Sequence, residues 1–142
     1  MSSFSESGGA SPKVLIVDDE EDVLAYVVAV LEDNGFRAVG ESDPASALDV
    51  IQREHPDLIL LDIMMPGQSG LSLYRELRRH RATAAIPVII ISGYSPKEEL
   101  ATVLSRLDCE KVPRPNGYLE KPISVPAFLE NVRELLAAPR GE

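Results

Sequence analysis

The sequence predicts a single α/β domain, a doubly wound three-layer sandwich in which helices cover both faces of a parallel five-stranded sheet. Short apolar runs alternate five times along the chain with segments that have the apolar spacing of an amphipathic helix. Parallel strands need helical crossovers between them, so this strict alternation predicts a parallel sheet between two helical layers. The length of 142 residues suits one domain of ordinary size.

The expected secondary-structure elements follow directly from these runs. The strands are predicted at 13–17, 37–42, 57–61, 87–91 and around 118–119. The helices are predicted at about 20–34, 43–54, 71–79, 95–107 and 124–136. Each helical segment repeats its apolar residues three or four positions apart, which gives it one face to bury against the sheet.

Three helix ends carry recognisable capping residues. The pair Asn34-Gly35 supplies a C-terminal stop for the first helix. Asp43 is a favourable N-cap for the second helix, and Pro44 suits its first turn. Residues 95–98 read Ser-Pro-Lys-Glu, a capping box for the fourth helix.

Composition excludes several classes of function. The chain has 14 Lys and Arg against 23 Asp and Glu, a net charge of −9, which disfavours nucleic-acid binding. The longest apolar runs, 58–61 and 88–91, fall far short of the ~20 residues that span a bilayer. The lone Cys109 excludes an intramolecular disulfide. The N-terminal segment lacks the basic start and apolar core of a signal peptide, so we expect a cytoplasmic protein.

The domain is expected to extend from residue 13 to residue 138. The Ser/Gly-rich residues 1–12 are predicted to be a disordered N-terminal tail, and 139–142 a C-terminal tail. This leaves no room in the chain for a DNA-binding or catalytic output domain. We therefore expect its effect to pass through contact with another protein or through an output domain outside this chain.

Polar residues that could form a site follow four of the predicted strands. They are Asp18, Asp19 and Glu20 after the first, Asp62 after the third, Ser92 after the fourth and Lys121 after the fifth. Ligands of open α/β sheets bind at the carboxyl ends of the strands. Carboxylates that converge there favour Mg²⁺, and a hydroxyl with an ammonium suits an anionic phosphoryl group. The pattern thus predicts a small magnesium and phosphoryl site.

Four motifs in this order resemble those of a response-regulator receiver domain of two-component signalling. They are Asp18-Asp19-Glu20, Asp62-Ile63-Met64-Met65-Pro66-Gly67 with Gly70 following, Ser92-Gly93, and Tyr118-Leu119-Glu120-Lys121-Pro122. The resemblance covers nearly all of the predicted domain. It implies a flavodoxin-like (βα)5 fold with strand order 2-1-3-4-5, like that of the chemotaxis regulator.

The resemblance also implies a role for each acidic residue. Asp62 would accept a phosphoryl group from the phosphohistidine of a sensor histidine kinase or phosphotransfer protein. Asp19 and Asp62 would bind Mg²⁺ directly, together with the backbone carbonyl of Met64, while Asp18 would orient the other ligands or bind through water. Such a protein modifies only itself and is not an enzyme in the ordinary sense.

The remaining implied roles concern catalysis and switching. Lys121 would pair with the phosphoryl oxygens, and Ser92 would donate a hydrogen bond to one of them. Tyr118 matches the switch aromatic, which turns inward as Ser92 moves and so changes the face formed by the fourth helix, fifth strand and fifth helix. The bond between Lys121 and Pro122 matches the family's cis peptide.

The sequence departs from the family pattern in three places. Ser92 replaces the more usual threonine, although it keeps the hydroxyl. The 29 positions between Ser92 and Lys121 exceed the usual spacing, and the extra length is predicted around 108–116, where two prolines oppose a regular helix. Tyr94 is expected to crowd the phosphoryl group and slow its hydrolysis.

Several structural alternatives stay open. Asp18 and Asp19 could cap the first helix, Tyr118 could be a half-buried edge aromatic, and the arginines at 75–81 are expected to complement a helix dipole. The whole chain could also be a degenerate receiver that binds partners without taking phosphate. A phosphohydrolase with an aspartyl nucleophile is disfavoured, because Met64 stands where a general acid would be needed.

Overall fold

The computed structural model describes residues 11–63, 70–93 and 96–137. Within these residues the strands form one parallel sheet in the order β2-β1-β3-β4-β5. They are β1 (Lys13–Val17), β2 (Arg37–Glu41), β3 (Leu58–Asp62), β4 (Val88–Ser92) and β5 (Gly117–Glu120). The predicted fold class and strand order are confirmed.

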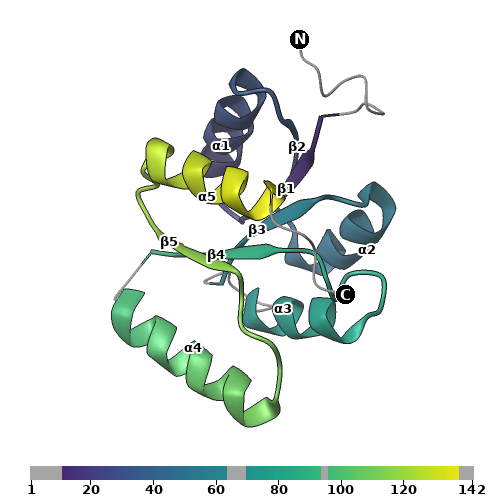
Figure 1. Cartoon of the computed structure of the whole chain (residues 1–142), viewed down its shortest axis with the longest axis vertical. Helices are drawn as coiled ribbons and strands as arrows, with labels where there is room; N and C mark the ends of the chain where they lie inside the picture. Colours follow the sequence, from purple (N-terminus) through teal and green to yellow (C-terminus); the bar gives the residue numbers. More distant parts are fainter. Residues whose placement is uncertain (1–10, 64–69, 94–95, 138–142) are drawn as a thin grey trace.

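Helices cover both faces of the sheet, as predicted (Figure 1). They are α1 (Glu21–Asp33), α2 (Pro44–Glu54), α3 (Gly70–Arg79), α4 (Pro96–Glu110) and α5 (Val125–Ala137). Helices α1 and α5 lie on one face, and α2, α3 and α4 lie on the other. None of the helices in the described residues is both long and apolar enough to cross a membrane.

Each face of the sheet has its own hydrophobic core. Val14 and Ile16 of β1 point into the core beneath α1 and α5, whereas Leu15 and Val17 point into the core beneath α2, α3 and α4. Strands β3 and β4 alternate in the same way. Successive side chains of a strand point to opposite faces, so a strand covered on both sides must be apolar throughout, as these runs are.

Two of the predicted helix ends are confirmed in detail. Asp43 caps α2, because its Oδ1 accepts a hydrogen bond from the Ala45 N–H at 3.0 Å. At the end of α1, Asn34 is the C-cap and Gly35 follows with φ 90°. This backbone conformation is unfavourable for residues with a Cβ atom, so glycine suits the position. The predicted capping box at 95–98 lies outside the side chains that the structure describes.

The predicted end of α4 near Leu107 is wrong, because the helix continues to Glu110. Leu107 is its last buried residue, and the final turn is exposed. Apolar periodicity could not reveal a turn that buries nothing. Glu110 instead pairs with Arg75 of α3 through two contacts of 2.5 and 2.9 Å. The helix therefore takes up part of the extra length that was expected at 108–116.

The strand order determines where a ligand can bind. β1 and β3 are neighbours, but the chain leaves β1 towards β2 on one side and leaves β3 towards β4 on the other. The connections that follow the two strands therefore diverge at their carboxyl ends. Open α/β sheets bind ligands in the crevice at such a topological switch point.

Candidate functional site

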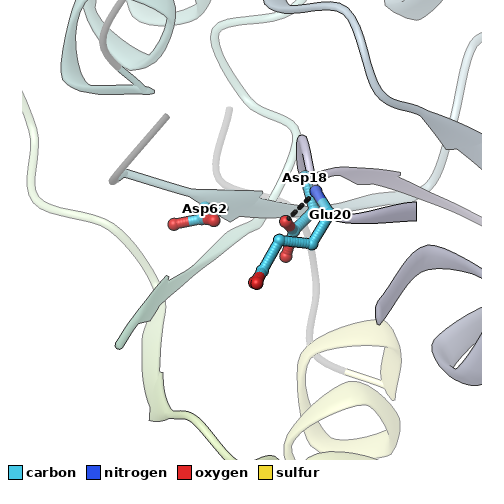
Figure 2. A group of neighbouring side chains, drawn as sticks. All are labelled: Asp18, Glu20 and Asp62. Carbon is cyan, nitrogen blue, oxygen red and sulfur yellow. Dashed lines mark hydrogen bonds between the residues drawn. The ribbon is translucent and has the colours of Figure 1, made fainter. Parts of the chain in front are cut away.

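The carboxyl ends of β1 and β3 bring two buried carboxylates together (Figure 2). Asp18 directly follows β1, and Asp62 is the last residue of β3. Val17 pairs with Leu61 in the sheet, so the two aspartates occupy the next position on neighbouring strands. Asp18 is 0% exposed and Asp62 is 2% exposed. Both carboxylates are therefore nearly excluded from bulk water, where a charge is costly unless it is paired.

A lysine reaches this pair of carboxylates from β5. The backbone N–H of Lys121 donates to the carbonyl of Ser92 at 2.9 Å, which holds the start of the side chain beside β4. The Lys121 Nζ lies 3.1 Å from Asp18 Oδ2 and 3.1 Å from Asp62 Oδ2. It also lies 2.5 Å from Oε1 of Glu20, an exposed residue just before α1. One ammonium thus contacts three carboxylates.

The two oxygens of Asp18 have different surroundings. Oδ1 accepts a hydrogen bond from the backbone N–H of Glu20 at 2.9 Å, drawn as a dashed line in Figure 2. Oδ2 has no hydrogen-bond partner among the described residues, although the Nζ of Lys121 lies 3.1 Å away as an ion pair. Burial and the nearby charge of Asp62 raise the pKa of Asp18 from 3.8 to about 6, against the opposing effects of Glu20 and Lys121.

Lys121 remains charged despite its partial burial. Burial acts to lower the pKa of its ammonium, but contact with the carboxylates of Glu20, Asp18 and Asp62 outweighs it and raises the pKa above its usual value. With all three acids ionised, the group carries an excess of negative charge that one ammonium does not neutralise. A cation bound among these oxygens would reduce that excess.

The acidic group fits a divalent metal ion with oxygen ligands. One carboxylate oxygen from each of Asp18, Glu20 and Asp62 lies within 4.8 Å of the others. The unsatisfied Asp18 Oδ2 and the negative excess both favour a cation. Mg²⁺ prefers oxygen ligands and takes one or two carboxylates together with waters and phosphate oxygens. These residues are therefore able to hold such an ion.

An open cavity of about 750 Å³ gives access to the acidic group. Its lining combines acidic residues with an apolar edge. The lining residues are Asp19, Glu20, Asp22, Val23, Tyr26, Asp62, Gly93, Lys121, Pro122 and Ile123. Because Asp62 and Lys121 both border this cavity, a ligand that enters it can reach the carboxylate and the ammonium together.

A second, smaller cavity lies beside the predicted switch residues. It has a volume of about 310 Å³ and is lined by Ile63, Ile90, Ser92, Leu100, Tyr118, Leu119 and Glu120. Ser92 is buried at the end of β4. Tyr118 is half-buried against the core beneath α2, α3 and α4, and this burial raises the pKa of its hydroxyl. This position fits the edge-aromatic interpretation, and the switch role of Tyr118 stays a prediction.

The structure brings some predicted site residues together and leaves others apart. Those in direct contact are Asp18, Asp62 and Lys121. Asp19 lines the larger cavity but does not belong to the closest acidic group. Met64 and Tyr94 lie outside the described residues. The peptide bond between Lys121 and Pro122 is cis, as the resemblance implies.

Glu20 is one of the polar residues expected after the first strand, but the sequence assigns it no role in the site. We expected it to begin the first helix, but the helix begins at Glu21, and Glu20 is an N-cap whose side chain makes no capping bond. Its carboxylate turns instead to Lys121. The run of three acids at 18–20 places Glu20 near the predicted site, whereas its contact with Lys121 is seen only in the structure.

Comparison with known proteins identifies the family. Residues 14–133 match the family model of the response regulator receiver domain. The chain belongs to this family. Receiver domains act in two-component signalling as signalling modules rather than as ordinary enzymes, and they interact with histidine kinases or phosphotransfer proteins. Phosphorylation and Mg²⁺ are typical of the family, in agreement with the metal-binding capacity of the acidic group.

Similar proteins include both longer regulators and proteins of similar length. The receiver is 32% identical over 124 residues to the phosphate regulon transcriptional regulatory protein PhoB of Escherichia coli (strain K12), covering 87% of this chain and 51% of PhoB. It is 32% identical over 123 residues to the polar-differentiation response regulator DivK of Brucella ovis, covering 87% of this chain and 94% of DivK. The chain therefore spans about half the length of PhoB.

A solved receiver structure agrees with the fold. The receiver domain of the Francisella response regulator 1452 superposes with a TM-score of 0.74 at 30% identity. The match covers 89% of this chain and 97% of that one.

Proposed function

We propose that this receiver domain accepts a phosphoryl group on Asp62 from the phosphohistidine of a sensor histidine kinase or phosphotransfer protein, with Mg²⁺ bound beside Asp62. The observation that carries this proposal is the contact of Lys121 with the buried Asp18 and Asp62, where Asp18 Oδ2 lacks a hydrogen bond. A merely structural ion pair would not need a second buried carboxylate with an unsatisfied oxygen.

The transfer is a displacement at phosphorus. A carboxylate oxygen of Asp62 attacks, the bond from phosphorus to the imidazole nitrogen breaks, and that nitrogen keeps the bonding electrons. The reaction has a loose, anionic transition state, so positioning and positive charge supply most of the catalysis. Bound Mg²⁺ supplies part of this charge, with Asp18, Asp19, Asp62 and the carbonyl of Met64 as its proposed ligands.

Lys121 supplies the rest of the positive charge. Its Nζ is already 3.1 Å from Asp62 Oδ2. An ammonium at this distance can donate to a phosphoryl oxygen with little rearrangement. Ser92 ends the neighbouring strand, and we assign its hydroxyl to a second phosphoryl oxygen.

Phosphorylation would then shift the conformation of Ser92 and Tyr118. An aspartyl phosphate carries about one more negative charge than the carboxylate and has additional acceptor oxygens. If Ser92 moves towards them, the cavity of about 310 Å³ beside it offers space for the Tyr118 ring. The outer face of α4, β5 and α5 would change in consequence, and a downstream protein or an output domain outside this chain would read the change.

The domain limits and the location also remain proposals. We assign the receiver to residues 13–138, with 1–12 and 139–142 as tails, and we propose that it acts in the cytoplasm. The match to the family model over 14–133 supports the main limits.

The decisive experiment is a titration with beryllofluoride, an analogue of the phosphoryl group, in the presence of Mg²⁺. Backbone amide NMR signals near Asp62, Ser92 and Tyr118 should shift in the wild-type protein. Asp62→Asn should abolish the shifts, whereas Asp49→Asn, on the exposed surface of α2, should retain them. No shift in the wild type, or an equal shift in Asp62→Asn, would favour a degenerate receiver that acts by partner binding alone.

A further inference from the structure

The ammonium of Lys121 lies among three carboxylates and donates hydrogen bonds to two of them, Glu20 and Asp62. It contacts Asp18 and Asp62 at 3.1 Å each and Glu20 at 2.5 Å. These two acceptors and the nearby oxygen of Asp18 already surround the ammonium, so an additional oxygen has to compete with them for it. A phosphoryl group on Asp62 brings such oxygens.

The three partners differ in how easily they can leave. Asp18 is fully buried and is held by the backbone N–H of Glu20, and Asp62 is buried at the end of its strand. The side chain of Glu20, in contrast, is 58% exposed. Water can replace Lys121 as the partner of an exposed carboxylate at little cost, whereas a buried carboxylate would lose a partner that nothing replaces.

We propose that Glu20 is a positioning residue that holds Lys121 before phosphoryl transfer and is displaced from it by a phosphoryl oxygen. Glu20 thereby competes with the phosphoryl group and sets how tightly the site holds it. This inference rests on the proposed function and adds to it a determinant of phosphoryl affinity that belongs to this chain's own sequence.

A different role for Glu20 makes the opposite prediction. One of its oxygens lies within 4.8 Å of ligand atoms of Asp18 and Asp62, so it could instead coordinate the metal. A competitor for Lys121 should weaken phosphoryl binding without affecting Mg²⁺ binding. A metal ligand should strengthen Mg²⁺ binding. The two affinities therefore have to be measured separately.

The experiment compares wild type with Glu20→Gln, which is nearly the same size but carries no charge. Mg²⁺ is titrated first, and beryllofluoride is then titrated at saturating Mg²⁺, with amide NMR shifts as the readout. We expect Glu20→Gln to bind beryllofluoride about threefold more tightly, the scale of one exposed ion pair. We expect its Mg²⁺ affinity to equal that of Glu21→Gln, which removes a charge one residue away.

Two further variants separate direct contact from a general effect of charge. Glu21→Gln changes the net charge equally, but Glu21 is not one of the three carboxylates that contact Lys121, so its beryllofluoride affinity should equal that of the wild type. Glu20→Asp keeps the charge on a shorter side chain that reaches less far towards Lys121. It should therefore bind beryllofluoride more tightly than the wild type, as Glu20→Gln does.

Three results would overturn the proposal. The first is a beryllofluoride affinity of Glu20→Gln that is unchanged or weaker. The second is a Mg²⁺ affinity of Glu20→Gln more than about threefold below that of Glu21→Gln. The third is a Glu20→Asp variant that binds beryllofluoride like the wild type while Glu20→Gln binds it more tightly. If beryllofluoride caused no amide shifts in the wild-type protein, that result would instead refute the proposed function. In that case the Nζ signal of Lys121, measured in wild type and Glu20→Gln, still reports whether Glu20 holds the ammonium.

Discussion

The polar groups at the carboxyl ends of the strands differ from those at the amino ends in how completely they are paired. At the carboxyl ends of the strands, Lys121 faces three carboxylates, and a buried oxygen of Asp18 lacks a hydrogen bond among the described residues. At the amino ends of β4 and β5, the guanidinium of Arg78 donates four hydrogen bonds. Its acceptors are the Tyr74 hydroxyl, the carbonyls of Ala84 and Ile86, and the side-chain oxygen of Asn116.

The Arg78 network joins three segments of the chain. Tyr74 donates onward to the carbonyl of Pro113 at 2.5 Å, and Asn116 pairs with Val88 at the start of β4. The end of α3 is thereby tied to the loop before β4 and to the loop before β5. Arg78 binds carbonyls of the loop before β4 rather than those at the end of its own helix, so the expected dipole role of the basic cluster stays a prediction.

The contrast shows how polar groups can serve stability or function in one fold. A network in which most donors and acceptors have partners favours one conformation and has little left to offer a ligand. A group with excess charge and an unsatisfied oxygen costs stability, and a cation or phosphoryl group can recover that cost by binding. The network at the amino ends of the strands is thus expected to contribute stability, and the group at their carboxyl ends to contribute binding and chemistry.

The largest expected effect comes from removing Lys121. Lys121→Ala should accept phosphate from acetyl phosphate about 100-fold more slowly, because a donor aimed at the developing charge is lost. The rate can be measured by phosphate-affinity gel electrophoresis at saturating Mg²⁺.

Lys13 offers a matched control for Lys121. Its side chain has the same 19% exposure, and it pairs with Glu54 near the amino end of β1. Lys13→Ala should leave the rate of phosphate acceptance unchanged. If Lys13→Ala slowed phosphate acceptance as much as Lys121→Ala, the functional difference between the two ends of the strands would be contradicted.

Arg78 should show the reverse behaviour. Arg78→Leu should lower the free energy of unfolding by about 2–3 kcal/mol, because it leaves the partly buried carbonyl of Ile86 and hydroxyl of Tyr74 without this donor. Urea denaturation measures this loss, and Arg79→Leu, at an exposed position on the same helix, should cause little change. The folded Arg78→Leu protein should still accept phosphate at the wild-type rate. A slower rate would show that the Arg78 network influences the site at the carboxyl ends of the strands.

Much of the candidate site could be predicted because topology alone determines it. Parallel strands that alternate with helices must end at one edge, so Asp18, Asp62 and Lys121 had to approach one another whatever their rotamers. The cores were equally predictable, since strands covered on both faces must be apolar.

Contacts between polar side chains far apart in the sequence could not be predicted. Glu20 and Lys121 are separated by 101 positions, and Arg78 and Asn116 by 38. No periodicity relates such residues, and an exposed side chain has several rotamers of similar energy. The last turn of α4 escaped prediction for a related reason, because an ion pair with Arg75 accompanies it and no buried face marks it.

The titration of Asp18 should reveal how much its buried negative charge destabilises the folded protein. Its folded-state pKa of about 6 exceeds the unfolded value of 3.8, so the folded protein binds more protons between these pH values. Without Mg²⁺, the stability of the wild type relative to Asp18→Asn should therefore fall as pH rises from about 4 to about 6, by roughly 1–3 kcal/mol. Urea denaturation across this range measures the difference.

Saturating Mg²⁺ provides the control for this titration. A bound cation favours the ionised carboxylate, so the fall in relative stability should diminish or disappear when the metal is present. If relative stability rose with pH in the metal-free protein, attraction to Lys121 would outweigh burial, and Asp18 would belong to a well-satisfied ion pair after all.

The smallest effect is expected from the ion pair of Asp108 and Arg114, which lies in the segment that the Arg78 network holds. Both side chains are about half exposed, at 52% and 55%. The hydrogen bond from Arg114 lowers the pKa of Asp108, so any stabilisation is present above the unfolded pKa and is lost as pH falls. In Arg114→Ala, a carboxyl-carbon NMR titration should find a higher pKa for Asp108, with a smaller difference at high salt.

Asp108→Asn should nevertheless leave the midpoint of urea denaturation unchanged within error, because an exposed pair exchanges solvent contacts for protein contacts of similar strength. This result would separate two explanations of how the segment between α4 and β5 is held. If Asp108→Asn destabilised the protein as much as Arg78→Leu, the number of charge pairs would decide its stability. If only Arg78→Leu does so, the deciding factor is whether partly buried acceptors such as the Ile86 carbonyl keep their donor.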